Sequence, residues 1–232
     1  MLQRRRAVEL EFDRVEASGL VKLYGSTRAL GGVTATFEAG KCTVVEGPNG
    51  SGKSTLLAIL AQLARPTRGT VRYGAHDGRS GGAALRGRIG VLAHGAMIYP
   101  DLTARENLRL FATLYGLASP SDVVSRLAER FEIGSWIDRP ARTYSRGQLQ
   151  RVSVARAVMH APRLLLLDEP STGLDARALD RLADVVGEER DRGAIVVLVT
   201  HDAPFAERVA ERRVRLERGR VVTPEAEPAE VA

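Results

Sequence analysis

The sequence predicts an α/β fold built around a buried parallel sheet. Residues 164–167 (LLLL) and 195–199 (IVVLV) form short, uninterrupted apolar runs, which are typical of strands covered on both faces of such a sheet. A glycine-rich turn at 47–54 lies between a strand pattern at 42–45 and an apolar helical stretch at 53–63. This order of strand, turn and helix favours the same fold class.

Further strands are expected in the first ninety residues. Alternating apolar and polar residues at 8–12 and 33–37 predict half-buried strands. Short strands are also expected at 70–73 and 89–92, on either side of a glycine-rich loop at 74–87.

Helices are expected between residues 103 and 160. Thr103 with Glu106, and Ser145 with Gln148, fit the capping-box pattern, in which two side chains satisfy free N–H groups at a helix start. Another helix is expected to begin near Asp175, between the two buried strands.

These positions predict one domain over residues 1–222. A helical subdomain at about 93–161 interrupts the α/β core. Residues 223–232 are rich in proline, alanine and glutamate, and are expected to form a disordered tail.

The composition is that of an ordinary globular protein. Hydrophobic residues make up 44% and charged residues 27% of the 232 positions, which excludes disorder as the main description. The apolar run at 194–199 is far shorter than the roughly 18–20 residues that span a bilayer, so no transmembrane helix is expected. A single cysteine, Cys42, and a start without a secretory signal favour the cytoplasm.

The chain is basic, with 34 Lys and Arg against 28 Asp and Glu and a net charge of +6. Such an excess indicates an anionic partner, either nucleic acid or a phospholipid surface. The alternative is genomic base composition, because nearly all of the basic residues are arginines.

The turn at 47–54 (GPNGSGKS) fits the phosphate-binding pattern G-x-x-x-x-G-K-[ST]. Its glycines let backbone N–H groups turn toward phosphates, and the helix that follows directs its positive dipole end at them. We expect Lys53 to reach the β- and γ-phosphates and the Ser54 hydroxyl to bind Mg²⁺. The flanking strand and helix are the context that this motif needs, so the turn predicts nucleotide binding.

Two carboxylates, Asp168 and Glu169, follow the buried strand at 164–167. In open parallel sheets, ligands bind at the carboxyl ends of the strands. We expect Asp168 to hold Mg²⁺, directly or through water, and Glu169 to act as the general base that orients the attacking water. The alternative is an ordinary strand followed by an acidic helix cap.

The segment 144–148 (YSRGQ) precedes a long helical pattern at 149–160. With the motifs above, the chain resembles the ATP-binding subunits of ABC transporters over essentially its full length. The signature of that family is usually L-S-G-G-Q. The segment matches it at Ser145, Gly147 and Gln148 and differs at Tyr144 and Arg146. The resemblance implies a head-to-tail dimer in which the signature contacts the γ-phosphate held by the opposite subunit. The capping box alone explains two of these residues without a ligand.

The resemblance implies a P-loop NTPase fold of the ABC ATPase type, with a RecA-like core, an antiparallel β subdomain and a helical subdomain. Tyr24 matches the aromatic residue that stacks on adenine, although a plain strand-end tyrosine is the alternative. Asp175 matches the loop that connects the two ATP sites, and it also fits a helix N-cap. His201 matches the switch histidine, which would bond the γ-phosphate and position the water.

One position departs from the family pattern. ABC ATPases usually carry a glutamine where the helical insert leaves the core, and His94 stands there in this chain. A neutral imidazole donates or accepts as an amide does, but it becomes cationic near a pH of about 6.5. The alternative is that His94 only packs or faces solvent.

The predicted function is ATP hydrolysis that powers export through separate integral membrane subunits, at the cytoplasmic face of the cell membrane. His94, the segment 99–108 and the segment 145–147 resemble most the haem exporter of cytochrome c maturation. The alternatives are another ABC-2-type exporter of lipids or drugs, or a soluble ABC ATPase that acts on nucleic acid or ribosomes. Direct nucleic acid binding is not expected.

The expected site comprises catalytic, metal-binding and ATP-binding residues, with Mg²⁺ as cofactor. The catalytic residues are Glu169 and His201, and the metal ligands are Ser54 and Asp168. The ATP-binding residues are Tyr24, Gly47, Pro48, Asn49, Gly50, Ser51, Gly52, Lys53, Ser54, Thr55, His94, Ser145, Gly147, Gln148 and Asp175.

Overall fold

A six-stranded sheet forms the centre of the molecule in the computed structural model, which describes residues 10–78, 80–93, 95 and 97–222. The strand order is β10-β9-β3-β8-β7-β6, and all neighbours pair in parallel except β9 and β10. The strands are β3 (Lys41–Glu46), β6 (Ile89–Leu92), β7 (Leu164–Asp168), β8 (Ile195–Val199), β9 (Arg212–Glu217) and β10 (Arg220–Val221). The predicted parallel sheet is therefore confirmed.

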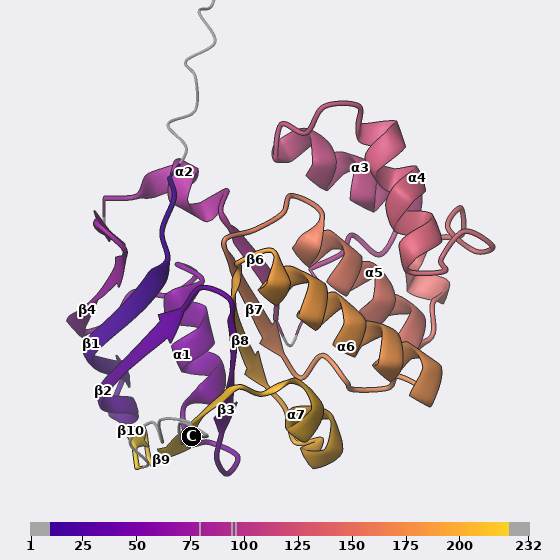
Figure 1. The fold of residues 1–232 in the computed structure, drawn as a ribbon. Helices are drawn as coiled ribbons and strands as arrows, with labels where there is room; N and C mark the ends of the chain where they lie inside the picture. The colour runs from indigo at the N-terminus through magenta and orange to yellow at the C-terminus, as the bar shows by residue number, and fades with distance from the viewer. Residues whose placement is uncertain (1–9, 79, 94, 96, 223–232) are drawn as a thin grey trace, which may run out of the picture.

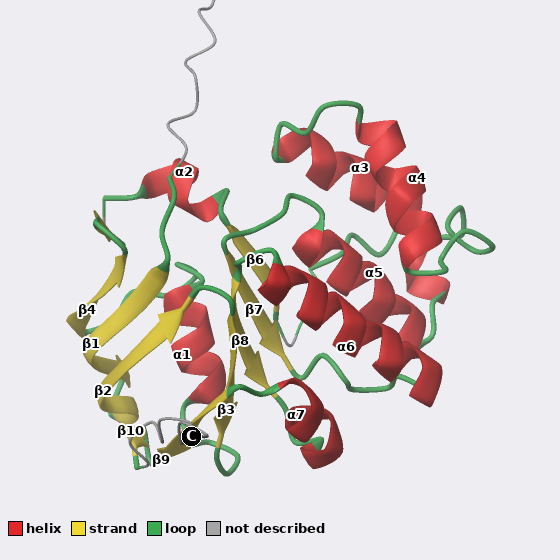
Figure 2. Cartoon of the chain, viewed as in Figure 1, coloured by secondary structure: helices red, strands yellow, loops and turns green. Residues whose placement is uncertain are grey.

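A second sheet, of four antiparallel strands, lies beside this core (Figure 1). Its order is β2-β1-β4-β5. The strands are β1 (Arg14–Tyr24), β2 (Thr27–Glu38), β4 (Arg68–Tyr73) and β5 (His76–Asp77). Helix α1 (Lys53–Leu60) lies between the two sheets (Figure 2), and its buried leucines join one hydrophobic cluster with both of them.

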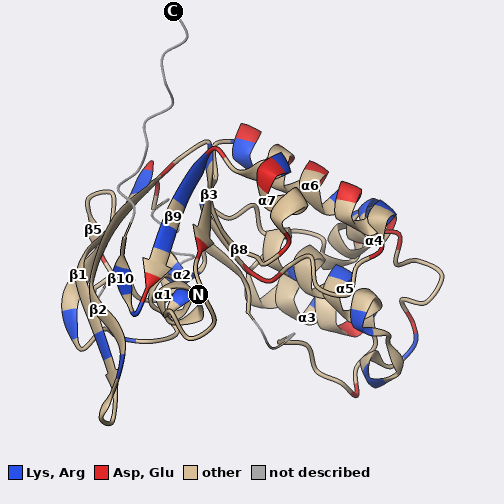
Figure 3. Ribbon diagram, turned by 90° about the horizontal axis from the view of Figure 1, so that it is seen from below, with Lys and Arg blue, Asp and Glu red and all other residues tan. Residues whose placement is uncertain are grey.

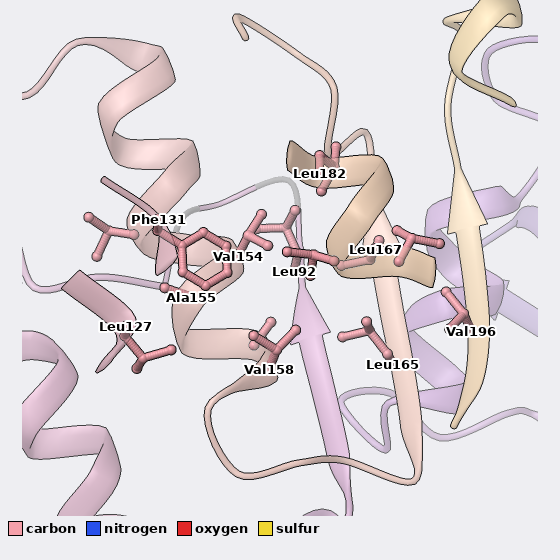
Figure 4. Packing of buried hydrophobic residues seen from close by; sticks show 14 of the residues in the cluster. Leu92, Leu127, Phe131, Val154, Ala155, Val158, Leu165, Leu167, Leu182 and Val196 are labelled. Atoms are coloured by element: carbon pink, nitrogen blue, oxygen red, sulfur yellow. The ribbon is translucent and has the colours of Figure 1, made fainter. Parts of the chain in front are cut away.

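Strand β7 is buried on both faces because its side chains alternate between two hydrophobic clusters. Leu164 and Leu166 belong to the cluster that contains α1 and the antiparallel sheet. Leu165 and Leu167 point the other way, into the cluster that contains α5 (Arg146–Val158) and α6 (Ala176–Asp191) (Figure 4). Four consecutive leucines are thus explained by burial on both sides.

Two helices, α3 (Ala104–Leu114) and α4 (Pro120–Arg130), lie on the far side of α5 from the sheet (Figure 1). The short 3₁₀ helix η1 (Ala141–Thr143) precedes α5 in the chain. Both predicted capping boxes are present, at Thr103 with Glu106 and at Ser145 with Gln148. Two short helices complete the described chain, α2 (Gly82–Arg86) and α7 (Ala203–Val209).

The structure differs from the sequence-based expectations in three places. Residues 10–12 were expected to be strand but precede β1; Leu10 and Phe12 are nevertheless buried, and residues 8 and 9 lie outside the described part. Helix α1 ends at Leu60 because Gln62 takes a left-handed backbone conformation (φ 59°). The expected loop at 74–87 contains β5 and α2. The predicted tail at 223–232 lies outside the described residues.

No helix in the described part of the chain is both long enough and apolar enough to cross a bilayer.

Replacing a leucine of β7 tests how much this packing contributes to stability. Leu165 is fully buried, so Leu165→Ala should lower the free energy of unfolding by about 2–5 kcal/mol through lost burial and a cavity. Leu114 on α3 is 68% exposed. Leu114→Ala should therefore change the free energy of unfolding by only about 0.5 kcal/mol or less. Urea unfolding of both variants measures the difference, and equal effects would contradict the assigned core.

Candidate functional site

The candidate site lies at one edge of the six-stranded sheet. Strand β8 lies between β3 and β7 in parallel register, with Val44 beside Leu198 and Asp168 beside Val199. The three strands therefore end at the same edge. The loop at 47–52, the loop at 200–202 and Glu169 follow these strand ends directly and meet there.

The loop at 47–52 is pressed between segments from both sheets. A Cβ atom at Gly47 (φ 141°) would collide with the carbonyl oxygen of Leu216 in β9. A Cβ atom at Gly52 (φ 105°) would lie 2.6 Å from the carbonyl oxygen of Ala29 in β2. On the outer side, the N–H of Gly219 donates to the carbonyl oxygen of Ser51 at 3.0 Å. Glycine is therefore required at both positions by space and by backbone conformation.

Lys53, the first residue of α1, holds this loop closed. Its ammonium group donates to the carbonyl oxygens of Gly47 (2.7 Å) and Pro48 (3.1 Å), and the residue is 7% exposed. The buried hydroxyl of Ser51 has no hydrogen-bond partner among the described residues. The first turn of α1 contains no acidic residue. The loop thus combines a cation, an unsatisfied hydroxyl and a helix N-terminus, which together suit a phosphate group.

Three other predicted residues of this loop, Pro48, Asn49 and Gly50, are exposed to solvent. Ser54 is also exposed, and Thr55 is half-buried, at the start of α1. The structure therefore places the predicted segment in one loop, partly exposed and partly buried, that leads into one helix.

Tyr24 lies at the tip of the β1–β2 hairpin, paired with Thr27. Its side chain is 53% exposed, and the Lys22 ammonium lies 4.8 Å from the ring centroid. Ala29 of the same hairpin contacts the loop near Gly52. The ring is therefore exposed on a hairpin that contacts the loop, and it is open to stacking on another ring.

Glu169 and His201 contact each other at the ends of β7 and β8. One carboxylate oxygen of Glu169 lies 3.3 Å from His201 Nε2, and the other accepts the His201 backbone N–H at 3.1 Å. Glu169 adopts a left-handed backbone conformation (φ 52°), which costs free energy in a residue other than glycine and is common at functional sites. A carboxylate and an imidazole held together in this way can accept a proton from water and hydrogen-bond to an anion.

Ser54 and Asp168 are suited to Mg²⁺ by the chemistry of their donor atoms. Helix α1 packs against β7 and β8, so the start of α1 and the end of β7 lie at the same edge. Hydroxyl and carboxylate oxygens are ligands that Mg²⁺ prefers, and this ion commonly takes its remaining ligands from phosphates and water. In the described ranges, no three His, Cys, Asp or Glu side chains gather into a metal cluster.

The segment 145–148 is anchored to the loop at 173–175. The Ser145 hydroxyl accepts the Gln148 backbone N–H at 3.2 Å, and the Gln148 side chain accepts the Ser145 N–H at 3.0 Å. A Cβ atom at Gly147 would lie 2.7 Å from the Gly173 carbonyl oxygen, so this glycine is required for the close approach. Asp175 caps α6 by accepting the N–H of Ala178 at 2.8 Å. Within the described chain, no hydrogen bond or ion pair joins this segment to the phosphate loop.

Three side chains that sequence reasoning missed fasten these loops together. Gln150 donates to the carbonyl oxygens of Glu169 (3.2 Å) and Pro170 (2.9 Å). The hydroxyls of Ser171 and Thr200 lie 3.0 Å apart and join the loops after β7 and β8. Glutamine, serine and threonine are common residues, and their spacing in the sequence does not indicate that they join these loops. His94, predicted to complete the site, lies outside the described residues.

The fold and the phosphate loop define a P-loop nucleotide-hydrolysing enzyme. The model of the ABC transporter family matches residues 30–172. The chain therefore belongs to this family as an ATP-binding subunit, an ATPase of the ABC type. The predicted fold class and the predicted ATPase activity are both confirmed at the level of the family.

Relatives in this family carry names that refer to different cargoes. The daunorubicin/doxorubicin resistance ATP-binding protein DrrA of Streptomyces peucetius is 39% identical over 210 residues, which cover 90% of this chain. The chain spans 64% of that protein's length. The lipoprotein-releasing system ATP-binding protein LolD of Anaeromyxobacter dehalogenans is 39% identical, covering 90% of this chain and 92% of that protein. The cytochrome c biogenesis ATP-binding export protein CcmA 2 of Cupriavidus metallidurans is 35% identical. That alignment covers 83% of this chain and 92% of that protein.

A solved structure shows the same fold with nucleotide products bound. The ATP-binding cassette MJ0796, a dimer in a post-hydrolysis state with ADP and phosphate, superposes with a TM-score of 0.84. It is 28% identical to this chain, and the alignment covers 92% of this chain and 98% of that one.

Lys53→Ala should weaken nucleotide binding. It removes the positive charge from the phosphate loop together with two hydrogen bonds to loop carbonyls, so ATP affinity should fall by roughly ten- to a hundredfold. Lys41, an exposed lysine at the start of β3, provides the matched control, Lys41→Ala, which should bind as the parent does. Calorimetry with ATP and Mg²⁺ measures both, and unchanged affinity of the Lys53 variant would overturn the phosphate-loop assignment.

Proposed function

We propose that this chain is the ATP-hydrolysing subunit of a membrane exporter and works with separate integral membrane subunits. It would act at the cytoplasmic face of the membrane as a peripheral subunit. The observation that carries the catalytic part is the contact between Glu169 and His201, at the same sheet edge as the phosphate loop. The exporter part rests on the relatives, whose printed names include a lipoprotein-releasing system and an export protein.

In the proposed reaction, some residues bind ATP and others act on the attacking water. Lys53 and the loop N–H groups bind the β- and γ-phosphates, and Tyr24 stacks on adenine. Glu169 takes a proton from the attacking water, while His201 hydrogen-bonds to the γ-phosphate and holds the water in line. Ser54 and Asp168 would hold Mg²⁺, which neutralises phosphate charge when bound.

The second half of each ATP site comes from another subunit in this proposal. The MJ0796 cassette is dimeric, which supports a dimer here. In a head-to-tail arrangement, the segment 145–148 of one copy would meet the γ-phosphate held by the other copy. Asp175 and its loop would then connect the two sites.

The narrower proposal is haem export in cytochrome c maturation. The CcmA 2 relative supports it, because this chain covers 92% of that protein. The DrrA and LolD relatives support drug or lipoprotein export equally well, at 39% identity each. Sequencing the neighbouring genes distinguishes these cargoes, since haem-handling membrane subunits would favour haem and a lone exporter permease would contradict it.

The distribution of charge supports a protein partner in the membrane over direct nucleic acid binding. Lys and Arg are interspersed with Asp and Glu around the molecule (Figure 3). Many of the described arginines are neutralised by nearby carboxylates, as in the pairs of Arg105 with Asp138 and of Arg212 with Glu38. A nucleic-acid surface would need unpaired cations gathered on one face.

An apolar surface at the start of the helical region offers a place for the membrane subunits. Met97, Tyr99 and Leu114 are exposed by 44%, 54% and 68%. Buried Asn107 holds this segment in place, because its side chain accepts the Tyr99 N–H and donates to the Tyr99 carbonyl oxygen. Exposed apolar groups at neighbouring positions are typical of protein interaction sites.

Arg156 connects this surface to the sheet. It is buried, it donates to the carbonyl oxygen of Val91 in β6 at 2.6 Å, and its guanidinium lies 5.1 Å from the Phe111 ring of α3. Burial lowers the pKa of this guanidinium. A movement of α3 would therefore be transmitted to the end of β6, next to the ATP site.

Glu169→Gln tests the proposed hydrolysis and dimer. It removes the proton acceptor, so phosphate release should fall by about 10²–10⁴-fold, while ATP binding persists and a dimer accumulates with ATP and Mg²⁺. Glu129→Gln, on the exposed face of α4, is the matched control and should hydrolyse ATP normally. Phosphate release and size-exclusion chromatography report the outcome. Turnover at the parent rate would contradict the assigned base, and a persistent monomer would contradict the dimer.

Leu114→Asp tests the proposed membrane docking. A charge at this exposed apolar position should disrupt binding to the membrane subunits, because a carboxylate loses its hydration when it is buried without a partner. The expected result is that membrane proteins co-purify with the parent chain and are lost with the variant. Thermal unfolding should be unchanged, since the side chain is exposed. Undiminished co-purification would exclude this surface.

A further inference from the structure

Strand β9 carries two exposed arginines beside the strand that leads into the phosphate loop. Its apolar residues Val214 and Leu216 are buried in the cluster that contains α1. Side chains alternate between the two faces of a strand, so Arg213 and Arg215 lie on the opposite face, toward α7. Strands β9 and β3 pair in parallel, with Arg215 beside Glu46. The basic face of β9 therefore lies next to the last residue of β3.

Glu46 places a carboxylate at the start of the phosphate loop. It is half-buried and directly precedes Gly47, whose carbonyl oxygen accepts the Lys53 ammonium at 2.7 Å. One terminal nitrogen of Arg213 donates to the Glu46 carboxylate. The other lies 3.0 Å from a carboxylate oxygen of Glu207 in α7. Arg213 thus joins the strand before the phosphate loop to α7, which follows the loop after β8.

The second arginine of this face has a partner of its own. Arg215 donates to Glu217, two residues further along β9, at 2.9 Å. Among the described residues, Arg213 is the only ion-pair partner of Glu46. Loss of the Arg213 guanidinium would therefore leave a carboxylate without a counter-charge next to the phosphate loop.

We propose that Arg213 promotes ATP binding by neutralising Glu46 beside the phosphate loop. It acts through Glu46 and is therefore a positioning residue; the inference rests on the proposed phosphate loop. A carboxylate without a counter-charge would repel the phosphates, and the guanidinium cancels much of that repulsion. Both side chains are partly exposed, so water and salt screen the interaction. We expect an effect of several-fold on affinity rather than a complete loss of binding.

The size of this effect depends on the charge of the nucleotide. ATP carries more negative charge than ADP, so an uncompensated Glu46 would repel ATP more strongly. Arg213 therefore favours ATP over ADP and helps the site to exchange product for substrate. A general disturbance of the loop would instead weaken the binding of both nucleotides alike.

The test compares Arg213→Gln, Glu46→Gln and the variant that carries both changes. Arg105→Gln is the matched control, because it breaks an exposed ion pair with Asp138 in the helical region and changes the net charge equally. Calorimetry measures the affinities for ATP and for ADP, each with Mg²⁺, at low and at high salt. Thermal unfolding checks that every variant is folded.

Arg213→Gln should lower ATP affinity by about three- to tenfold and ADP affinity by less. Adding Glu46→Gln should restore the parent affinity, because the carboxylate that repels the phosphates is then removed as well. Glu46→Gln alone should bind ATP at least as tightly as the parent, and Arg105→Gln should equal the parent. High salt should reduce the difference between Arg213→Gln and the parent.

The possible failures are distinguishable. Unchanged ATP affinity of Arg213→Gln overturns the role of Arg213 and leaves the phosphate loop intact. A loss that persists in the double variant, or that is equal for ATP and ADP, also overturns it, since Arg213 would then act on the shape of the loop and not through the charge of Glu46. If Lys53→Ala binds ATP as the parent does, the phosphate loop itself fails, and the role of Arg213 fails with it.

Discussion

The burial of β7 on both faces is the constraint on which the site depends. Its leucines alternate between two hydrophobic clusters, and it pairs in parallel with β6 on one side and β8 on the other. A shift of one residue would exchange the two faces and move every side chain to the wrong cluster. The register is therefore fixed, and with it the positions of Asp168 and Glu169 at the edge where β3 and β8 also end. The carboxylates at this edge are therefore positioned by the packing of the β7 leucines that precede them in the chain.

The phosphate loop depends on a second, long-range constraint. Segments far apart in the chain close on it, since Ala29 approaches Gly52 and the turn at Gly219 holds Ser51. The loop is thus the point where the antiparallel sheet and the last strands of the parallel sheet meet. Its shape is held by contacts within the chain, among them those of Lys53 with the loop carbonyls. A preformed loop lowers the entropy that nucleotide binding must overcome.

Local patterns predicted much of this fold, and long-range contacts account for what they missed. The buried strands, both capping boxes and the start of α6 at Asp175 follow from neighbouring residues, so a single sequence contains them. Contacts such as that of Gln150 with the Glu169 carbonyl join segments whose proximity only the folded chain creates. The buried Arg156 is a similar case, because nothing in its local sequence indicates that it contacts both β6 and α3. The roles of individual site residues came from the resemblance to a family, and they stay predictions.

The structural and functional interpretations of Ser145 are compatible because they use different parts of one hydroxyl. Capping uses the oxygen as an acceptor for the Gln148 N–H. The hydroxyl proton has no acceptor among the described residues and is free to donate to an anion. The capping box holds the Ser145 side chain in place, while Gly147 allows the close contact with Gly173. The capping role of Ser145 is therefore compatible with the proposed contact to a phosphate held by another copy.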